Sequence, residues 1–330
     1  MPEAHIIGTG SSIPKRILSN RDLETIVDTT DEWITRRTGI KERRVSSKGE
    51  KETTADMATQ ASLKALEMAQ ISPESLDMIV VGTVTQDRLF PSAACMVQKE
   101  LNADNAAAFD VSAGCSGFLY ALTMVNNAIR SGTCGNALVV GVDRLSSVMD
   151  WKDRSTCVLM ADGAGAVVVT PTTGQNGILS THLKSDGTLW GLLYSSNGDS
   201  FTPEILKDID MKPFYLRMEG NRLFKKAIEC MASITREALQ HNSISSEDIT
   251  LVIPHQANIR IIQGLVKNLN IPMERVYINI HKYGNTSSGS IPIALDEACR
   301  GGLLSKGDQV LLVAFGAGLT WASSILRWSI

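Results

Sequence analysis

Two spacings of hydrophobic residues alternate along the chain. Short runs of β-branched and aliphatic residues predict buried strands, and apolar residues at every third or fourth position predict helices. The clearest strands are NALVVGVDR (136–144), ITLVIP (249–254) and DQVLLVAFGAG (308–318). The clearest helices are ATQASLKALEMAQ (58–70), SGFLYALTMVNNAIRSG (116–132) and FKKAIECMASITREALQHNS (224–243). Strands and helices that alternate in this way are typical of layered α/β sheets.

The pattern occurs twice. In each half a helical period is followed by Ile-Ser-x-Glu and a β-branched strand, so that Ile71 matches Ile244 at a sequence offset of 173 (244 − 71). Further on, the corner at Cys115 matches the corner at Asn285 at a sequence offset of 170 (285 − 115). Two nearly equal offsets predict a duplicated α/β unit, whose period is far too long for a solenoid.

The joint between the two units is expected in the polar turn TPTTGQNG (170–177). We therefore predict an N-terminal half, residues 1–171, and a C-terminal half, residues 172–330. If the halves face each other across a pseudo-dyad, Cys115 and Asn285 come together.

The composition is that of an ordinary globular protein, with 43% hydrophobic and 20% charged residues over 330 positions. A net charge of −3 gives no general attraction to nucleic acid or to an anionic membrane. No apolar run approaches the roughly 18 residues of a membrane span, and MPEAHIIGTGSSIPK lacks the regions of a secretory signal. We expect a cytoplasmic protein with no nucleic-acid partner and no membrane insertion.

Six cysteines and five histidines are scattered without the spacing of a metal site. We predict no metal and, in a reducing compartment, free thiols. Taken alone, a free cysteine is usually a small buried hydrophobic residue.

Cys115 differs from the other cysteines because it precedes an amphipathic helix, in the small-residue corner SAGCSGF. A helix N-terminus lowers the pKa of a thiol and stabilises the nucleophilic thiolate. Gly114 and Gly117 permit a tight turn and the close approach of a substrate. A nucleophile and a merely packed cysteine are both open interpretations of this corner.

Three other corners are candidates for the same site. His255 follows a strand at its carboxyl end, where open α/β sheets bind ligands, and is either a base or donor or a satisfied surface histidine. Asn285 is either a partner of Cys115 or a helix N-cap. The glycine-rich turn FGAG (315–318) either presents amide N–H groups to an oxyanion or is a plain β-turn.

Seven motifs in order identify a family. They are DTTDEWITRRTGIKERR (28–44), FPSAAC (90–95), SAGCSGF (112–118), ADGAGAVV (161–168), PHQANIRI (254–261), YGNTSSGSIP (283–292) and FGAGLTW (315–321). This series resembles β-ketoacyl-[acyl carrier protein] synthase III of the thiolase superfamily. The resemblance covers the whole chain. It implies a five-layer αβαβα fold of two similar halves, a homodimer, and a decarboxylative Claisen condensation of an acyl-CoA primer, acetyl-CoA in the first instance, with malonyl-acyl carrier protein.

The resemblance also implies roles for residues in the corners. Cys115 would carry the acyl group, and His255 and Asn285 would donate hydrogen bonds to the malonyl thioester carbonyl. The backbone amides of Cys115 and Ala317 would hold the oxyanion of acyl transfer. Some relatives have glycine at the latter position, and a backbone donor tolerates alanine unless φ is positive.

The remaining implied contacts surround these three residues. The CoA-binding residues would be Thr29, Trp33, Arg37, Arg154 and Asn258, with Trp33 stacked on the adenine. The acidic carrier protein would meet Gln256, Ala257, Asn258, Ile259 and Arg260, together with the basic residues Arg222, Lys225, Lys226 and Lys267. Leu145 and Met160 would line the acyl pocket, and Phe90 would reach the pocket of the neighbouring subunit. CoA is here a substrate, and no cofactor is implied.

Three other functions are compatible with parts of this pattern. The first is a secondary-metabolite condensing enzyme or acyltransferase related to synthase III, with another acyl donor or acceptor. The second is a binding module for acyl-CoA or carrier protein that has lost catalysis, and the third is a thioester hydrolase. The size and branching of the primer also stay open, because Met160 replaces an aromatic residue found in some relatives and is flexible.

Overall fold

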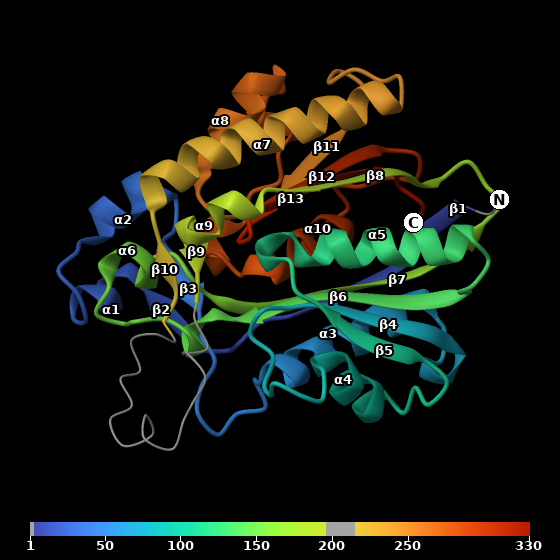
Figure 1. The fold of residues 1–330 in the computed structure, drawn as a ribbon, viewed down its shortest axis with the longest axis horizontal. Coiled ribbons are helices and arrows are strands. Elements are labelled where there is room, and N and C mark those ends of the chain that lie inside the picture. The colour runs from blue at the N-terminus through green and yellow to red at the C-terminus, as the bar shows by residue number, and fades with distance from the viewer. Residues whose placement is uncertain (1–2, 196–214) are drawn as a thin grey trace.

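The structure is a computed structural model that describes residues 3–195 and 215–330, and its chain is organised around two mixed sheets (Figure 1). The first sheet has five strands in the order β1-β7-β6-β4-β5, and the second has four in the order β11-β12-β13-β8. The strands of the first sheet are β1 (Glu3–Ser12), β4 (Leu76–Gly82), β5 (Ala107–Val111), β6 (Asn136–Arg144) and β7 (Asp162–Thr172). Those of the second are β8 (Gly177–Ser185), β11 (Leu251–Pro254), β12 (Gln309–Gly316) and β13 (Thr320–Arg327).

Helices cover both sheets and separate them, which gives five layers in the order αβαβα (Figure 1). Helices α3 (Thr54–Ala69) and α4 (Ala93–Leu101) pack on the outer face of the first sheet. Helices α7 (Gly220–His241) and α8 (Ile259–Leu269) pack on the outer face of the second. Helices α5 (Gly117–Arg130) and α10 (Ser290–Arg300) lie between the two sheets. The five-layer fold expected from the sequence is confirmed.

The two central helices form where the sequence predicts them because most of their faces are buried. In α5, the stripe of Leu119, Leu122, Val125 and Ile129 is fully enclosed between the sheets. Burying each such side chain contributes about 2 kcal/mol to stability. A helix enclosed in this way carries apolar residues around most of its circumference. Its N-terminus lies between the sheets, directly after the turn that contains Cys115.

Small elements surround one end of this sandwich and form a separate apolar cluster that includes Trp33, Leu145 and Met160. They are β2 (Ile17–Ser19), α1 (Asn20–Glu24), α2 (Asp31–Thr38), β3 (Glu42–Arg44), α6 (Arg154–Cys157), β9 (Leu193–Tyr194), β10 (Arg217–Met218) and α9 (Ile280–Tyr283). Among the described helices, none is long and apolar enough to cross a membrane.

The two sheets repeat one pattern of strand directions. β4 and β6 are parallel while β6, β7 and β1 pair antiparallel, and β11 and β12 are parallel while β12, β13 and β8 pair antiparallel. This supports the duplicated unit. β7 ends at Thr172 and β8 begins at Gly177. The placement of the joint between the two halves at residue 172 stays a prediction.

The structure corrects one offset of the repeat. The 3₁₀ turn η2 (Gly114–Ser116) precedes α5, and the 3₁₀ turn η8 (Ser287–Gly289) precedes α10, which sets the offset of the two turns at 173 (287 − 114). Cys115 is therefore equivalent to Ser288, and Asn285 lies three residues earlier. An offset of 170 relates only the C-terminal ends of the two helices, because α10 has 11 residues and α5 has 14.

Candidate functional site

One cavity of about 1320 Å³ brings together the three residues on which the sequence analysis centred. Cys115 comes from η2, His255 follows β11, and Asn285 precedes η8, and all three line this cavity. Ala317, after β12, lines it as well. The Cys115 corner is far in sequence from the other three corners, so the layered fold itself assembles the site.

Close backbone packing fixes the Cys115 corner. Gly114 has a φ of +54°, and a Cβ there would lie 2.6 Å from the Ala317 nitrogen. A Cβ on Gly316 would lie 2.4 Å from the Cys115 nitrogen. The Thr320 hydroxyl donates to the Ala113 carbonyl at 2.7 Å. The amides at Cys115 and Ala317 therefore belong to two turns in direct contact, and φ of Ala317 is not positive.

The acidity of the thiol differs from the prediction. Burial is the main cause that raises the pKa of the Cys115 thiol to about 12; a hydrogen bond with the Ser287 side chain opposes the rise, and the Asp143 carboxylate adds to it. The sequence analysis considered the helix N-terminus, which favours the thiolate, but not the enclosure of the thiol between the sheets. A pKa raised in this way favours the protonated thiol of Cys115 at neutral pH.

His255 is held at the end of its strand as a neutral side chain. Its backbone N–H donates to the Val313 carbonyl at 2.8 Å, which extends the pairing of β11 with β12. The residue is 3% exposed, and burial lowers the pKa of the imidazole to about 4. Its Nδ1 atom is buried without a hydrogen-bond partner in the part of the chain that the structure describes. At neutral pH the uncharged ring can donate one hydrogen bond and accept another.

Asn285 is fixed through both its backbone and its side chain. Its N–H donates to the Leu159 carbonyl at 2.9 Å, and its carbonyl accepts from the Ala161 N–H at 2.9 Å. The Ser287 N–H donates to the side-chain Oδ1 at 2.9 Å. Because Oδ1 is occupied, the Nδ2 end of the amide is the donor left for a ligand.

Asp143 is a buried carboxylate that the sequence analysis did not single out. Its Oδ1 accepts from the Thr83 hydroxyl, the Val84 N–H and the Thr85 hydroxyl at 2.8–3.1 Å, and its Oδ2 accepts from the Ser288 N–H at 3.2 Å. Burial raises the pKa of this carboxyl. One signal was available in the sequence, since a charged residue in an otherwise apolar strand must find buried partners.

The predicted CoA-binding residues differ in whether they line the cavity. The guanidinium of Arg154 lies 4.8 Å from the centre of the Trp33 ring, and that of Arg37 lies 5.9 Å from it. Trp33, Arg37 and Asn258 line the cavity, whereas Arg154 reaches it only through the tryptophan. Thr29 does not line the cavity, and its buried hydroxyl has no hydrogen-bond partner among the described residues.

The residues predicted to meet the carrier protein divide into exposed and buried ones. Ala257 and Arg260 line the cavity, Arg260 is exposed, and Ile259 is half-buried at the start of α8. Gln256 is 1% exposed, and its side chain is bonded inside the chain, which argues against a direct contact of this side chain with the carrier protein.

The basic residues predicted around this rim differ in how they are paired. Arg222 pairs with Glu219 at 3.0 Å, and Lys226 pairs with Glu229 at 3.1 Å. Lys225 lines the cavity with Arg260. Lys267 lies on α8 and does not line it.

The predicted acyl-pocket residues behave in two ways. Leu145 and Met160 are buried and line the cavity, as expected of walls around an acyl chain. Phe90 is 84% exposed and does not line the cavity, and its neighbour Leu89 is 78% exposed. The prediction for Phe90 concerns a second subunit, so this exposure leaves it a prediction.

Comparison with known proteins gives one consistent result. Residues 109–187 match the family described as 3-oxoacyl-[acyl-carrier-protein] synthase III, and residues 239–328 match its C-terminal part. The chain is 52% identical over 326 residues to β-ketoacyl-[acyl-carrier-protein] synthase III of Caldanaerobacter subterraneus, covering 99% of this chain and 98% of that protein. The enzyme of the same name from Aquifex aeolicus is 50% identical, with 98% and 99% covered.

Solved structures agree with these sequence matches. The crystal structure of the Aquifex aeolicus synthase III superimposes with a TM-score of 0.92 and covers 98% of this chain and 100% of that chain. The priming β-ketosynthase of the R1128 polyketide biosynthetic pathway superimposes with a TM-score of 0.93 at 38% identity, with 100% and 98% covered.

Proposed function

The chain belongs to the β-ketoacyl-[acyl-carrier-protein] synthase III family, and we propose that Cys115, His255 and Asn285 perform the reaction of that family. The enzyme is an acyltransferase that starts fatty acid synthesis by condensing an acyl-CoA with malonyl-acyl carrier protein. The observation that carries the assignment of residues is their convergence on one cavity.

In the first step, the Cys115 sulfur attacks the thioester carbonyl of the acyl-CoA. A bond forms between Sγ and the acyl carbon, the bond from that carbon to the CoA sulfur breaks, and the thiol proton ends on the departing CoA. The Cys115 and Ala317 amides stabilise the tetrahedral oxyanion.

In the second step, malonyl-acyl carrier protein loses CO2. The bond between its carboxylate and its methylene carbon breaks, and the electron pair moves onto the thioester as an enolate. Hydrogen bonds from a ring N–H of His255 and from Asn285 Nδ2 stabilise that developing charge. The carbanion then attacks the acyl-enzyme, a carbon–carbon bond forms, and Cys115 leaves as the thiolate and takes up one proton.

The surroundings of the cavity support the proposed substrates. Trp33 with its two arginines offers a stacking and cationic site for the CoA nucleotide. Lys225 and Arg260 offer positive charge to an acidic carrier. Leu145 and Met160 bound the space for the primer's acyl group, in which a flexible thioether accepts several shapes.

A homodimer is the second part of the proposal. Leu89 and Phe90 are adjacent large apolar side chains that are mostly exposed in the single chain. Burying them against a second copy, with Phe90 at the partner's acyl pocket, would remove this apolar surface from water. Sedimentation of the wild type and of Phe90→Asp tests it, since the dimer is expected to weaken in the variant.

One relative favours a second candidate function. The priming β-ketosynthase of the R1128 pathway shares this fold at 38% identity, so an enzyme that primes polyketide rather than fatty acid synthesis is the alternative. The higher identity to the fatty acid enzymes, 52% and 50%, favours the first assignment.

Turnover with a panel of acyl-CoA primers separates the two candidates. Purified enzyme is incubated with malonyl-acyl carrier protein and each primer, and the acyl group on Cys115 and the released product are identified by mass spectrometry. A preference for acetyl-CoA or a short branched primer supports the fatty acid role. Turnover only with longer or unusual primers supports the alternative, and release of free acid alone contradicts both.

A further inference from the structure

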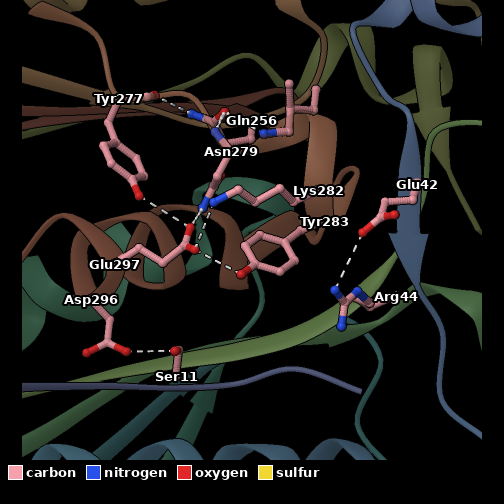
Figure 2. Close-up of polar contacts among 11 residues, drawn as sticks. Ser11, Glu42, Arg44, Gln256, Tyr277, Asn279, Lys282, Tyr283, Asp296 and Glu297 are labelled. Carbon is pink, nitrogen blue, oxygen red and sulfur yellow. Dashed lines mark hydrogen bonds and ion pairs between the residues drawn. The ribbon is translucent and has the colours of Figure 1, made fainter. Parts of the chain in front are cut away.

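Gln256 occupies a position between the two corners that the condensation step uses. It directly follows His255, and its backbone N–H donates to the Ser290 hydroxyl at 2.7 Å, at the start of α10. Its side chain does not line the cavity and is directed toward the segment that leads to Asn285, as Figure 2 shows for its contact with Asn279. The residue is 1% exposed, so neither substrate nor carrier protein reaches it.

The side-chain amide of Gln256 has all of its hydrogen-bonding capacity used inside the chain (Figure 2). Its Nε2 donates to the Pro254 carbonyl at 2.9 Å and to the Tyr277 carbonyl at 3.0 Å. Its Oε1 accepts from the N–H groups of Asn279 and Ile280 at 3.2 and 3.3 Å. A glutamine amide has two donors and two acceptor sites, and here each is occupied by backbone.

The segment that Gln256 holds is clamped from its other side by α10 (Figure 2). Glu297 accepts from Asn279 Nδ2 at 2.7 Å and from the Tyr283 hydroxyl at 2.9 Å. Lys282 pairs with the same carboxylate at 3.6 Å. Asn285 follows directly from this segment, after Gly284 with a φ of +69°.

From this geometry we infer that Gln256 is a positioning residue for the condensation step, which sets the separation of His255 and Asn285. It ties the end of the His255 strand to residues 277–280, and through them to Asn285. The four bonds of this amide all go to residues outside the Cys115 corner, so acyl transfer does not depend on it. The inference rests on the proposed function and gives Gln256 a role other than carrier binding.

Separate measurement of the two half-reactions tests the inference with the full-length protein. Gln256→Met keeps the size of the side chain and removes all four bonds. We expect condensation kcat to fall about tenfold to hundredfold, since small misplacements of catalytic groups cost this much. The rate of Cys115 acylation from acetyl-CoA, and KM for malonyl-acyl carrier protein, should stay within about twofold of the wild type.

Gln98→Met is the matched control, because Gln98 also bridges backbone carbonyls, those of Ala103 and Ala106, but lies on α4 away from the cavity. Its two half-reactions should keep their wild-type ratio. A raised KM for malonyl-acyl carrier protein with normal kcat in Gln256→Met would mean a carrier contact and overturn the inference. So would an equal fall in both half-reactions, which indicates a general loss of structure.

A milder variant covers the case in which Gln256→Met does not fold. Asn279→Ala keeps its N–H to Gln256 and removes only the bond to Glu297, so condensation kcat should fall severalfold with acylation unchanged. Condensation at the wild-type rate in Asn279→Ala would overturn the inference. If the wild type itself forms no acyl-enzyme, the proposed function fails instead, which keeps the two failures distinct.

Discussion

The turns η2 and η8 are two copies of one corner. In each, a left-handed residue begins a 3₁₀ turn that leads into a central helix, and φ is +54° at Gly114 and +51° at Ser287. Each turn also rests on a strand of the other half. A Cβ on Gly316 of β12 would touch the Cys115 nitrogen, and a Cβ on Gly141 of β6 would touch the Ser288 carbonyl.

The corners differ at one equivalent position on those strands. By the offset of 173 (316 − 143), Asp143 on β6 corresponds to Gly316 on β12. Asp143 caps the Ser288 N–H, whereas Gly316 has no side chain with which to cap the Cys115 N–H. We call the Ser288 turn, whose N–H is occupied by the Asp143 carboxylate, the sealed corner. We call the Cys115 turn, whose N–H is left as a donor to a ligand, the open corner. In the proposed mechanism, this uncapped N–H of Cys115 is one of the two donors to the oxyanion.

Replacement of the nucleophile is expected to have the largest effect on this comparison. Cys115→Ala should form no acyl-enzyme and lose at least about a thousandfold in condensation, because covalent catalysis needs the thiol. Intact-protein mass spectrometry after acetyl-CoA checks it. Cys95→Ala, which removes another free thiol, should keep the full adduct. A full adduct on Cys115→Ala would disprove the assignment of the nucleophile.

Closing the open corner is expected to have the next largest effect. In Gly316→Ala the new Cβ would lie 2.4 Å from the Cys115 nitrogen and obstruct the amide or displace the turn. The acylation rate should fall about hundredfold, the usual effect of losing one oxyanion donor. Gly187→Ala is the control, since its Cβ would meet no atom of residues 3–195 and 215–330 within 4 Å. Acylation of Gly316→Ala at the wild-type rate would show that this amide is not used.

The reactivity of Cys115 toward iodoacetamide tests how far its half-buried position in the cavity suppresses the thiolate. With the pKa raised to about 12, the neutral thiol persists above pH 9, and alkylation should increase about tenfold per pH unit from pH 7 to pH 10. Peptide mass spectrometry at each pH measures the rate. A plateau below pH 8 would mean that the helix N-terminus outweighs burial.

Weakening the sealed corner is expected to have the smallest effect. Asp143→Asn places an amide among four donors, so one of them loses its partner, and the free energy of unfolding should fall by about 1–3 kcal/mol. Condensation should fall about fivefold, and more than acylation, because Ser287 and Ser288 support Asn285. Urea unfolding and single-turnover kinetics measure the two quantities. A larger loss in acylation than in condensation would contradict the assigned support.

Much of the fold follows from local patterns in the sequence. The strand predicted at 136–144 is β6 with the same bounds, and the apolar stripe after Cys115 forms α5. His255 does lie at the end of a strand, in the cavity. These predictions succeed because hydrophobic periodicity reports burial along one element.

The predictions that failed depend on packing between elements. Burial between two sheets raises the pKa of Cys115, and no residue near it in sequence indicates this. The resemblance implied that Gln256 meets the carrier protein, yet the acceptors and donors that enclose its amide come mainly from residues 277–280. The sequence offset between Cys115 and Asn285 was misjudged because α10 is three residues shorter than α5. Aligning the ends of the two helices instead of their beginnings shifts the equivalent residue by three positions.

We propose a division of labour in which the Cys115 corner transfers the acyl group and the His255–Asn285 side performs the condensation. Asn285→Ala tests this claim most directly when treated with acetyl-CoA and then with malonyl-acyl carrier protein, with CO2 release and the mass of the protein followed together. The predicted result is acylation of Cys115 at the wild-type rate, persistence of the adduct, and little CO2. Loss of acylation, or normal condensation, would contradict the division of labour between the two corners.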